Sequence, residues 1–361
     1  MTKRTIDERM PRAAAARQGL ARPVEREDAR MVTSALDQYI ATAGECGGRI
    51  APLLDALADI PGADLLPLPA SGGTAERFSG LARVAAADVT AARVLEPHVD
   101  ALAILAEAGE PAPAPGSTWG VFAAEAPGAE TRAESADGGW TLHGRKAWCS
   151  LAGSLSHALV SASTGDGRRR LFAVALRDRV TVEPSGWVAH GLAEVESGPV
   201  RFDAAPATPV GADGWYLERP GFRWGGIGVA ACWLGATLPI LTAVIARARS
   251  RPDDAITGAR AGALHRSVHA ARLALDDAAR RIDGGAERDG AALAHTVRGL
   301  AADAAVEALA CARDVLGPAA LAFDASLARR CADLELYVSQ YHRGRDDASL
   351  ARHLGEVEAA W

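Results

Sequence analysis

The sequence is poor in aromatic residues, which make up 5% of its 361 residues although 49% of the chain is apolar. Much of the apolar share is alanine, the best helix former and a residue without side-chain entropy to lose. The composition therefore favours helices. The length is sufficient for two or three domains.

Cysteine is scarce and scattered. No two cysteines are spaced as a zinc knuckle or as a Cys-x-x-Cys redox pair. An odd, dispersed set is typical of reduced thiols, so we expect a cytoplasmic protein without a structural metal. The cysteines are Cys46, Cys149, Cys232, Cys311 and Cys331.

Long hydrophobic runs and an excess of basic residues are also missing. The best apolar stretch, residues 229–245, is diluted by alanine and glycine and is shorter than the ~20 residues that span a bilayer, so we expect no membrane span. A net charge of −6 argues against a nucleic-acid partner. We interpret Arg168–Arg170 as a hairpin tip, or as a contact for a phosphate group. Residues 1–30 lack the apolar core of a secretion signal and are predicted to be a mobile charged tail.

Residues 31–112 are predicted to form an N-terminal helical domain, because their apolar residues recur at helical spacing. Thr74 is placed as the cap of one helix. Pro97 suits the first turn of a further helix, which Gly109 would end.

Beyond a proline-rich linker, the period of the apolar residues changes from 3.6 to 2. Residues 113–212 contain short runs of alternating apolar residues, separated by glycine, proline and aspartate. Closely spaced short strands predict an all-β module, either a small barrel or a sandwich.

The helical period returns in residues 213–361. Four long helices with short connections predict an antiparallel bundle. The fold class is therefore α+β with several domains: an N-terminal helical domain, a central small β-barrel or sandwich domain and a C-terminal four-helix bundle. The bundle helices are expected at residues 222–249, 254–282, 289–316 and 324–353.

Two blocks in the β segment carry a family resemblance. Residues 122–131 read FAAEAPGAET and resemble the acyl-CoA dehydrogenase block aromatic-x-x-TEPGAGSD. Residues 139–150 read GWTLHGRKAWCS and are similar to the family block GxxLNGxKxWITN. Residues 221–235 resemble the start of the family's first C-terminal helix, and residues 329–333 the start of its last one.

The resemblance implies an FAD-dependent enzyme that dehydrogenates an acyl-CoA thioester by passing a hydride to flavin N5. A flavin ring needs hydrogen bonds to N5 and to its pyrimidine edge. By resemblance, an indole forms the wall beside the ring, a hydroxyl stands near N5, and main-chain groups meet the pyrimidine edge. The implied cofactor-binding residues are Ala124, Glu125, Trp148, Cys149 and Ser150.

The same resemblance implies a substrate contact and an assembly. Thr131 stands where the family places a hydroxyl against the pantetheine arm of CoA. Because family members bind FAD across subunit contacts, a homo-oligomer is implied as well.

The chain departs from the family pattern where a substrate proton would be removed. The family supplies a glutamate at one of two places, which fall here on Tyr341 and Gly225. His342 lies beside the first place and can act as acid or base near neutrality, so it is our candidate catalytic residue. Glu335, on the same predicted helix, is a weaker candidate. Glu125 replaces a family threonine, and its carboxylate would either repel charge on the reduced ring or point away.

Three functions follow from these observations. The first is an acyl-CoA dehydrogenase. The second is a flavin monooxygenase on the same fold, in which reduced flavin meets oxygen with His342 assisting. The third is a degenerate subunit that pairs with an active homologue.

Two further patterns resemble known motifs without the context that those motifs need. Residues 226–231 imitate the GxGxxA of a dinucleotide fold but follow no apolar strand. His265 and His269 have a spacing that can hold zinc, but the sequence offers no third ligand.

Overall fold

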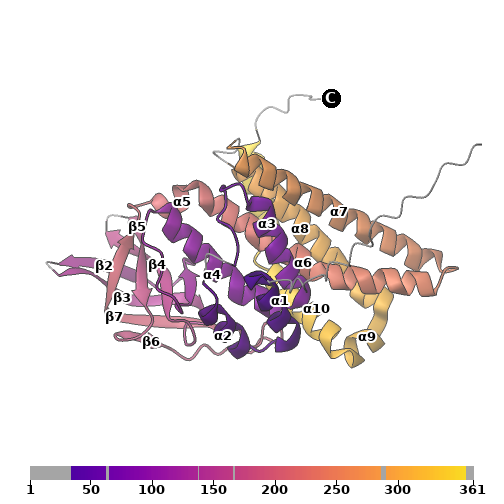
Figure 1. The fold of residues 1–361 in the computed structure, drawn as a ribbon, viewed down its shortest axis with the longest axis horizontal. Helices are drawn as coiled ribbons and strands as arrows, with labels where there is room; N and C mark the ends of the chain where they lie inside the picture. The colour runs from indigo at the N-terminus through magenta and orange to yellow at the C-terminus, as the bar shows by residue number, and fades with distance from the viewer. Residues whose placement is uncertain (1–33, 62–64, 137, 166, 286–289, 355–361) are drawn as a thin grey trace, which may run out of the picture. The chain divides into compact units, whose positions relative to one another are not determined.

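The computed structural model describes residues 34–61, 65–136, 138–165, 167–285 and 290–354 (Figure 1). Helices come first, strands second and helices again last, so the fold class predicted from the sequence is confirmed. The predicted tail, residues 1–30, lies outside the described residues.

Figure 1 labels most of the elements in chain order. The N-terminal helices are α1 (Ala35–Cys46), α2 (Ala51–Asp59), α3 (Thr74–Ala87) and α4 (Val89–Glu107). The strands are β1 (Trp119–Phe122), β2 (Thr131–Ala136), β3 (Gly139–Ser150), β4 (His157–Gly165), β5 (Arg168–Ala175), β6 (Val180–Val182) and β7 (Ser197–Val210). The C-terminal helices are α5 (Trp215–Glu218), α6 (Pro220–Ser250), α7 (Ala255–Asp283), α8 (Ala291–Cys311), α9 (Gly317–Phe323), α10 (Ala325–Val338) and α11 (Arg343–His353).

The break between α3 and α4 is set by Asp88. Its extended backbone ends α3, and its Oδ1 atom accepts the N–H of Ala91 at 3.1 Å, which caps the start of α4. Pro97, predicted in the first turn of a helix, lies inside α4 because this upstream cap begins the helix. Thr74, predicted as the cap of α3, is the first residue of that helix, and its hydroxyl donates to Asp283 at 2.6 Å.

The strands close into a small barrel, one of the two architectures predicted. β4 pairs with both β2 and β5, and the pairings β2–β3, β3–β7 and β7–β5 complete the ring. β1 lies parallel to β4, and β6 pairs with β7. Arg168–Arg170, predicted as a hairpin tip, begins β5 directly after the turn of the β4–β5 hairpin, where Arg168 pairs with Gly165.

The helix α6 is the most apolar long helix of the C-terminal part. By length and composition alone it could cross a membrane, and most of its apolar window is buried inside the protein. Residues 229–245 alone were expected to be too short to span a bilayer. The helix that contains them extends beyond this stretch at both ends. It contacts α3, α7 and α8. Helix α3 comes so close that a Cβ on Gly235 would overlap the carbonyl oxygen of Ala82, so α6 is a core helix of this unit.

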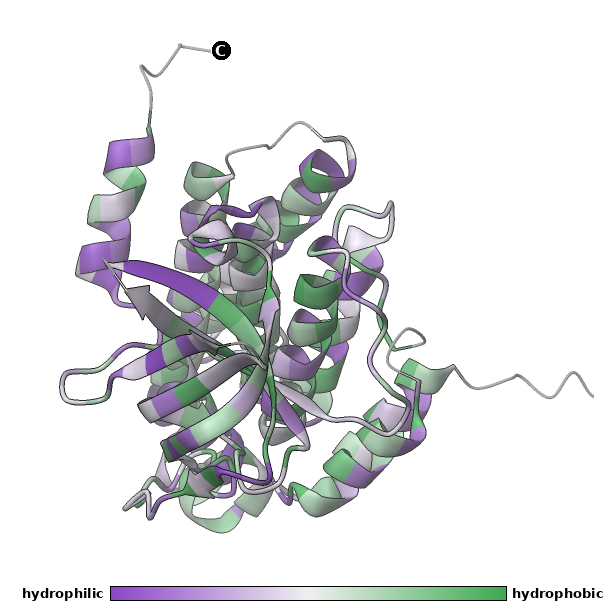
Figure 2. Cartoon of the chain, turned by 90° about the vertical axis from the view of Figure 1, so that its left-hand side faces the viewer, coloured by the Kyte–Doolittle hydropathy of each residue, from purple (hydrophilic) through white to green (hydrophobic). Residues whose placement is uncertain are grey.

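The last predicted helix, residues 324–353, is broken into α10 and α11. The intervening turn, residues 339–342, is fixed by a local cap: the main-chain N–H of His342 donates to Oδ2 of Asp346 at 3.0 Å. Glu335 and His342 therefore do not share a helix, contrary to the prediction. In Figure 2, α11 is largely hydrophilic, in keeping with its lack of buried residues.

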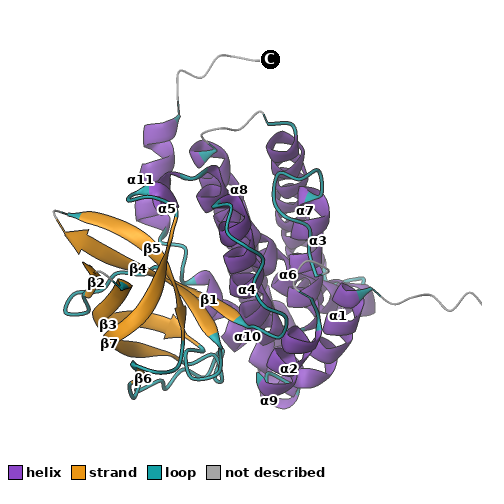
Figure 3. Cartoon of the chain, turned by 60° about the vertical axis from the view of Figure 1, so that its left-hand side comes forward, coloured by secondary structure: helices purple, strands orange, loops and turns teal. Residues whose placement is uncertain are grey.

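The barrel meets the helices through contacts between β1 and α4 (Figure 3).

The third predicted bundle helix, residues 289–316, is α-helical as far as Cys311 and is followed by a π-helical turn, Ala312–Leu316. Contacts join the described residues from Ser34 onward into one unit. The predicted limits of the three domains stay a prediction.

Candidate functional site

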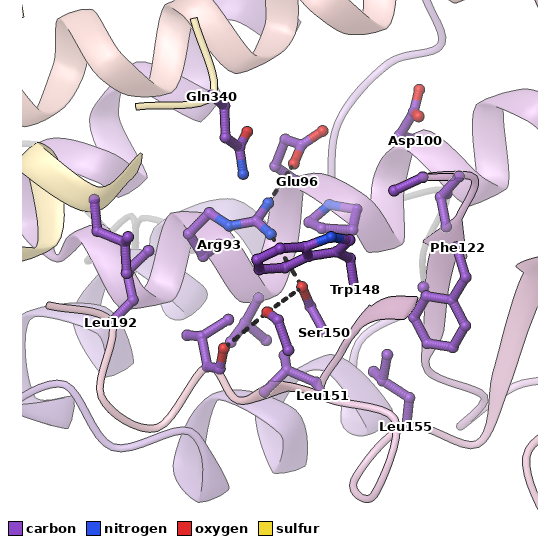
Figure 4. A pocket seen from close by; sticks show the side chains of 18 of the residues that line it. Arg93, Glu96, Asp100, Phe122, Trp148, Ser150, Leu151, Leu155, Leu192 and Gln340 are labelled. Atoms are coloured by element: carbon purple, nitrogen blue, oxygen red, sulfur yellow. Dashed lines mark hydrogen bonds and ion pairs between the residues drawn. The ribbon is translucent and has the colours of Figure 1, made fainter. Parts of the chain in front are cut away.

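A pocket of about 740 Å³ lies between the barrel and the helices (Figure 4). Its walls come from α4, from β1 and the end of β3, from the loop before β7 and from the turn between α10 and α11. Small-molecule and cofactor sites occupy roughly 300–1,000 Å³, so the pocket has the size of a ligand site.

Five residues that the sequence analysis selected meet in this pocket, although they come from three separate segments of the chain. Their presence in one lining makes the pocket the candidate site. They are Ala124, Glu125, Trp148, Ser150 and His342.

Three other selected residues lie outside the lining. Cys149 is buried, and burial raises the pKa of its thiol to about 12. Thr131 is also buried, and its hydroxyl donates to the carbonyl oxygen of Arg145 at 3.0 Å. Glu335 is exposed on α10. The individual roles implied by the resemblance stay predictions.

Trp148 is turned toward the pocket by an irregularity in β3. The pairing of β3 with β7 shifts register between Lys146 and Cys149, and Trp148 adopts a φ of 59°. A bulge of this kind re-aims a side chain. Although Trp148 is 59% exposed, Figure 4 shows its indole inside the pocket, where it offers a flat aromatic face to a ligand.

Two more lining residues share this strained backbone. Leu151 has a φ of 59° and Leu192 a φ of 50°. Positive φ is costly for bulky residues and tends to gather at binding sites. Three of the six non-glycine residues with positive φ in the described part of the chain line this one pocket.

Ser150 belongs to a hydrogen-bonded chain that borders the pocket (Figure 4). Its Oγ lies 2.7 Å from Oγ of Ser197, whose own hydroxyl donates to the carbonyl oxygen of Val195 at 3.1 Å. Ser150 is therefore the donor to Ser197, and its lone pairs remain as acceptors. Arg93 supplies one donor through Nη2 at 3.5 Å, and its Nη1 donates to Glu96 at 3.2 Å.

The face that α4 presents to the pocket was not predicted from the sequence. Arg93, Glu96 and Asp100 follow one another at spacings of three and four residues, which places them on one side of the helix. Arg93 and Glu96 are only 9% and 8% exposed. Charged residues at helical spacing within an otherwise apolar helix were the signal that could have found this face.

Burial disfavours the charged form of both carboxyl groups on α4. It raises the pKa of Glu96 to about 7, against the opposing effect of Arg93. It also raises the pKa of Asp100, although Arg219 and Arg77 oppose the shift. Asp100 has no hydrogen-bond or ion-pair partner among the described residues. Carboxyl groups of this kind in a pocket are candidates for proton transfer.

The carboxylate of Glu125 is paired with two cations. Its Oε1 lies 2.7 Å from Nζ of Lys146 and 2.6 Å from Nη1 of Arg169, and Ser161 donates to it at 3.1 Å. Burial lowers the pKa of Lys146, whose ammonium group donates to Glu125 and to Ser161. The negative charge at this edge of the pocket is thus compensated, although Glu125 does line the pocket.

Comparison by sequence identifies no relative: no protein-family model and no curated protein matches the chain. Solved structures do match. FMN-bound TdsC from Paenibacillus sp. A11-2 aligns with a TM-score of 0.72 and 16% identity, over 88% of this chain and 94% of TdsC. PigA with FAD and proline aligns with a TM-score of 0.73 and 15% identity, over 88% of this chain and 96% of PigA. KijD3 with FMN and a dTDP-linked amino sugar aligns with a TM-score of 0.65 and 19% identity, over 88% of this chain and 90% of KijD3.

This chain has the acyl-CoA dehydrogenase fold. The two β blocks had predicted it. At these identities the likeness concerns the fold alone.

Residues 329–333, which resemble the start of the last helix in the acyl-CoA dehydrogenase family, bind the end of α3 and the loop before β7 through hydrogen bonds. Arg330 donates to the carbonyl oxygens of Ala85–Ala87 at the end of α3. Asp333 accepts the main-chain N–H of Leu192 at 2.6 Å. The motif thereby holds the α3–α4 junction and a strained pocket residue in place.

The two places where the acyl-CoA dehydrogenase family carries its base differ in what surrounds them. A Cβ built on Gly225 would lie 2.9 Å from Oδ1 of Asp100, so a carboxyl group from α4 stands beside that place. Tyr341, at the other place, is buried, and its hydroxyl donates to Asp347 at 2.6 Å. The carboxyl groups that line this pocket near Gly225 therefore come from α4.

Proposed function

We propose that the protein is a flavin-dependent oxidoreductase whose flavin ring lies in the pocket beside Trp148. The observation that carries this proposal is the strained bulge of β3, which turns an exposed indole into a pocket of about 740 Å³. Ser150 and the main chain at Ala124 and Glu125 line the same space and would hold the ring. A bound flavin would supply hydride transfer, with the protein providing binding, orientation and electrostatics.

The pocket fits a flat polar ring in several respects. It has an aromatic wall, hydroxyl and main-chain groups, and a buried cation, Arg93, whose Nε has no hydrogen-bond partner among the described residues. Flavins in similarly folded chains support the proposal: TdsC and KijD3 were solved with FMN and PigA with FAD. FAD is the cofactor that the family resemblance implied, and FMN is the alternative to test beside it.

The substrate is proposed to be a compact polar molecule, oxidised with oxygen as the partner of the reduced flavin. The α4 wall carries Arg93, Glu96 and Asp100, and the carboxyl group of Asp100, which has no hydrogen-bond or ion-pair partner among the described residues, is available to bind a polar substrate. TdsC, a dibenzothiophene monooxygenase with this fold, supports oxygen chemistry. His342 lines the pocket and is proposed to assist.

Dehydrogenation of an acyl-CoA thioester is the second candidate. The observation that favours it is the carboxyl group of Asp100 beside Gly225, where it could remove a substrate proton. The homo-oligomer and the cytoplasmic location expected from the sequence remain proposals.

One experiment separates the two reactions. Flavin-loaded protein is mixed anaerobically with a panel of acyl-CoA thioesters, and separately supplied with a flavin reductase, NADH and oxygen. The proposal predicts oxygen consumption above that of flavin, reductase and NADH without the protein, an excess that His342→Ala reduces, with no bleaching by the thioesters. Anaerobic bleaching by a thioester would favour dehydrogenation. A protein that binds no flavin and shows neither reaction would fit the degenerate subunit.

A further inference from the structure

Arg93 and Glu96 form an ion pair at the wall of the pocket that the bulge of β3 faces. Nη1 of Arg93 donates to Glu96 at 3.2 Å, and both side chains are about nine-tenths buried. The guanidinium lies over the ring of Tyr337, 5.0 Å from its centroid, and its Nε has no partner among the described residues. Because Nε is buried, the guanidinium would meet a ligand in the pocket through its other nitrogens.

The direction of the hydrogen bonds at Ser150 makes Arg93 the donor at this edge of the pocket. The hydroxyl proton of Ser150 is directed to Ser197, because the hydroxyl of Ser197 is itself engaged with Val195. Ser150 therefore offers acceptor lone pairs, and the donor beside it is Arg93. At this edge of the pocket, the group that can both donate hydrogen bonds and carry positive charge is the guanidinium.

We propose that Arg93 and Glu96 set the reduction potential of the bound flavin, with Arg93 as the cationic donor and Glu96 as its counter-charge. This inference rests on the proposed function and deepens it. Arg93 stabilises negative charge that develops on the ring when it is reduced. Glu96 in its charged form cancels part of that effect, and in its neutral form it does not.

Glu96 is able to change its charge in the neutral pH range. Burial raises its pKa to about 7, so it is mostly neutral at pH 6 and mostly a carboxylate at pH 8. The groups that face it are Arg93 and Asp100 on α4, Arg77 on α3, Tyr216 on α5, Cys232 on α6, Arg298 on α8 and Tyr337 on α10.

Most of these neighbours keep one charge state between pH 6 and pH 8. The guanidinium groups stay protonated, and burial raises the pKa of Tyr337 and Cys232, which keeps both neutral. Asp100, whose pKa burial also raises, and His342, elsewhere in the lining, are the remaining groups to control for.

The test is the midpoint potential of the flavin, measured anaerobically against a reference dye at pH 6, 7 and 8. The variants are Glu96→Gln, Arg93→Gln and Arg93→Lys, each loaded with FAD or FMN. Asp100→Asn and His342→Asn are matched controls, and thermal melts verify folding. This readout needs no substrate, and a purely structural role for the pair would not move it.

At pH 6, Glu96→Gln is expected to match the wild type. At pH 8 it should hold about tenfold more reduced flavin at a fixed dye potential, equivalent to about 30 mV for a two-electron couple. Arg93→Gln should lower the potential at all three pH values, and Arg93→Lys should largely restore it. His342→Asn should keep the wild-type difference between pH 6 and pH 8, whereas Asp100→Asn removes a charge that raises the pKa of Glu96 and should move the pH effect to lower pH.

Parallel potentials for the wild type and Glu96→Gln from pH 6 to pH 8, or an unchanged potential in folded Arg93→Gln, would overturn this inference and leave the proposed function intact. Loss of the pH effect in His342→Asn would also overturn it, by assigning the titration to another group. Failure of the wild type to take up either flavin is visible in its absorbance before any potential is measured. That result would overturn the proposed function and this inference with it.

Discussion

Asp333 accepts a hydrogen bond of 2.6 Å from the main-chain N–H of Leu192, which joins α10 to the loop before β7. Leu192 lines the pocket with a positive φ, so this one bond holds a strained residue where a ligand would meet it. Residues 329–333, which resemble a family motif, thereby shape the pocket without lining it.

Replacing Asp333 by alanine is therefore expected to lower the free energy of unfolding by about 2–3 kcal/mol, because a buried N–H loses its acceptor. It should also weaken flavin binding, because Leu192 is released. Asp333→Asn keeps a carbonyl oxygen at the acceptor position and should cost less than about 1 kcal/mol. Urea unfolding at pH 7 measures both variants, and equal losses in the two would contradict this account.

The contact between α3 and α6 predicts that replacement by alanine destabilises the protein at one glycine of α6 and not at another. A Cβ on Gly235 would overlap the main-chain carbonyl of Ala82, which cannot move without shifting α3. A Cβ on Gly228 would lie 3.3 Å from the flexible Cδ1 atom of Leu81. Gly235→Ala should destabilise the protein by roughly 2–4 kcal/mol, whereas Gly228→Ala should stay within about 1 kcal/mol of the wild type. Thermal melts that rank them in the reverse order would show that the helices are spaced differently.

The carboxyl group of Glu96 predicts that the free energy of unfolding falls as the pH rises. Because its pKa is about 7 in the folded protein, above the usual 4.5, the folded chain keeps a proton that the unfolded chain has released. Stability from this group is thus lost between about pH 4.5 and pH 7, by about 3 kcal/mol in all.

Glu96→Gln cannot ionise, so it should gain stability relative to the wild type between pH 5 and pH 8. Denaturant unfolding at several pH values measures this difference. Glu335→Gln, which alters an exposed carboxylate outside the pocket, is the control and should show no such gain. A pH-independent difference between Glu96→Gln and the wild type would be inconsistent with a titrating Glu96.

The strained backbone at Trp148 predicts opposite effects on stability and on binding. Glycine adopts positive φ freely, and the indole is largely exposed, so Trp148→Gly should stabilise the ligand-free protein by up to about 1 kcal/mol. The same change removes the aromatic wall and should weaken flavin binding at least tenfold, as expected for about 1.4 kcal/mol or more of lost contact.

Arg179→Gly is the matched control for Trp148→Gly, because Arg179 has a φ of 68° but lies outside the pocket lining. It should gain stability in the melt without changing the flavin affinity. If Trp148→Gly leaves the affinity unchanged as well, the indole does not contact the ring.

The order of helices and strands was predictable because it depends on local patterns. The change of period from 3.6 to 2 and back marks the barrel, and the two β blocks lie within residues 122–150. Ala124, Glu125, Trp148 and Ser150 could be selected for the same reason: each belongs to a block that can be recognised without knowing what packs against it.

The wall of the pocket formed by α4 and by the turn between α10 and α11 could not be predicted in this way, because it depends on the packing of segments that are distant in the sequence. Pro97 suggested that a helix begins there, but the cap at Asp88 starts α4 earlier and brings Glu96 to the pocket. The division of the last predicted helix depends on a cap between Asp346 and His342 that periodicity does not reveal. Burial of Glu96, which gives it its raised pKa, is likewise a property of the packed protein.

The central claim is that the pocket beside Trp148 holds a flavin, and an absorbance titration of the purified wild-type protein with FAD and with FMN tests it most directly. The account predicts saturable uptake of one flavin per chain, with visible bands perturbed from those of the free cofactor. It also predicts that the uptake weakens in Trp148→Gly and persists in Arg179→Gly. A colourless wild-type protein that takes up neither cofactor would contradict the claim.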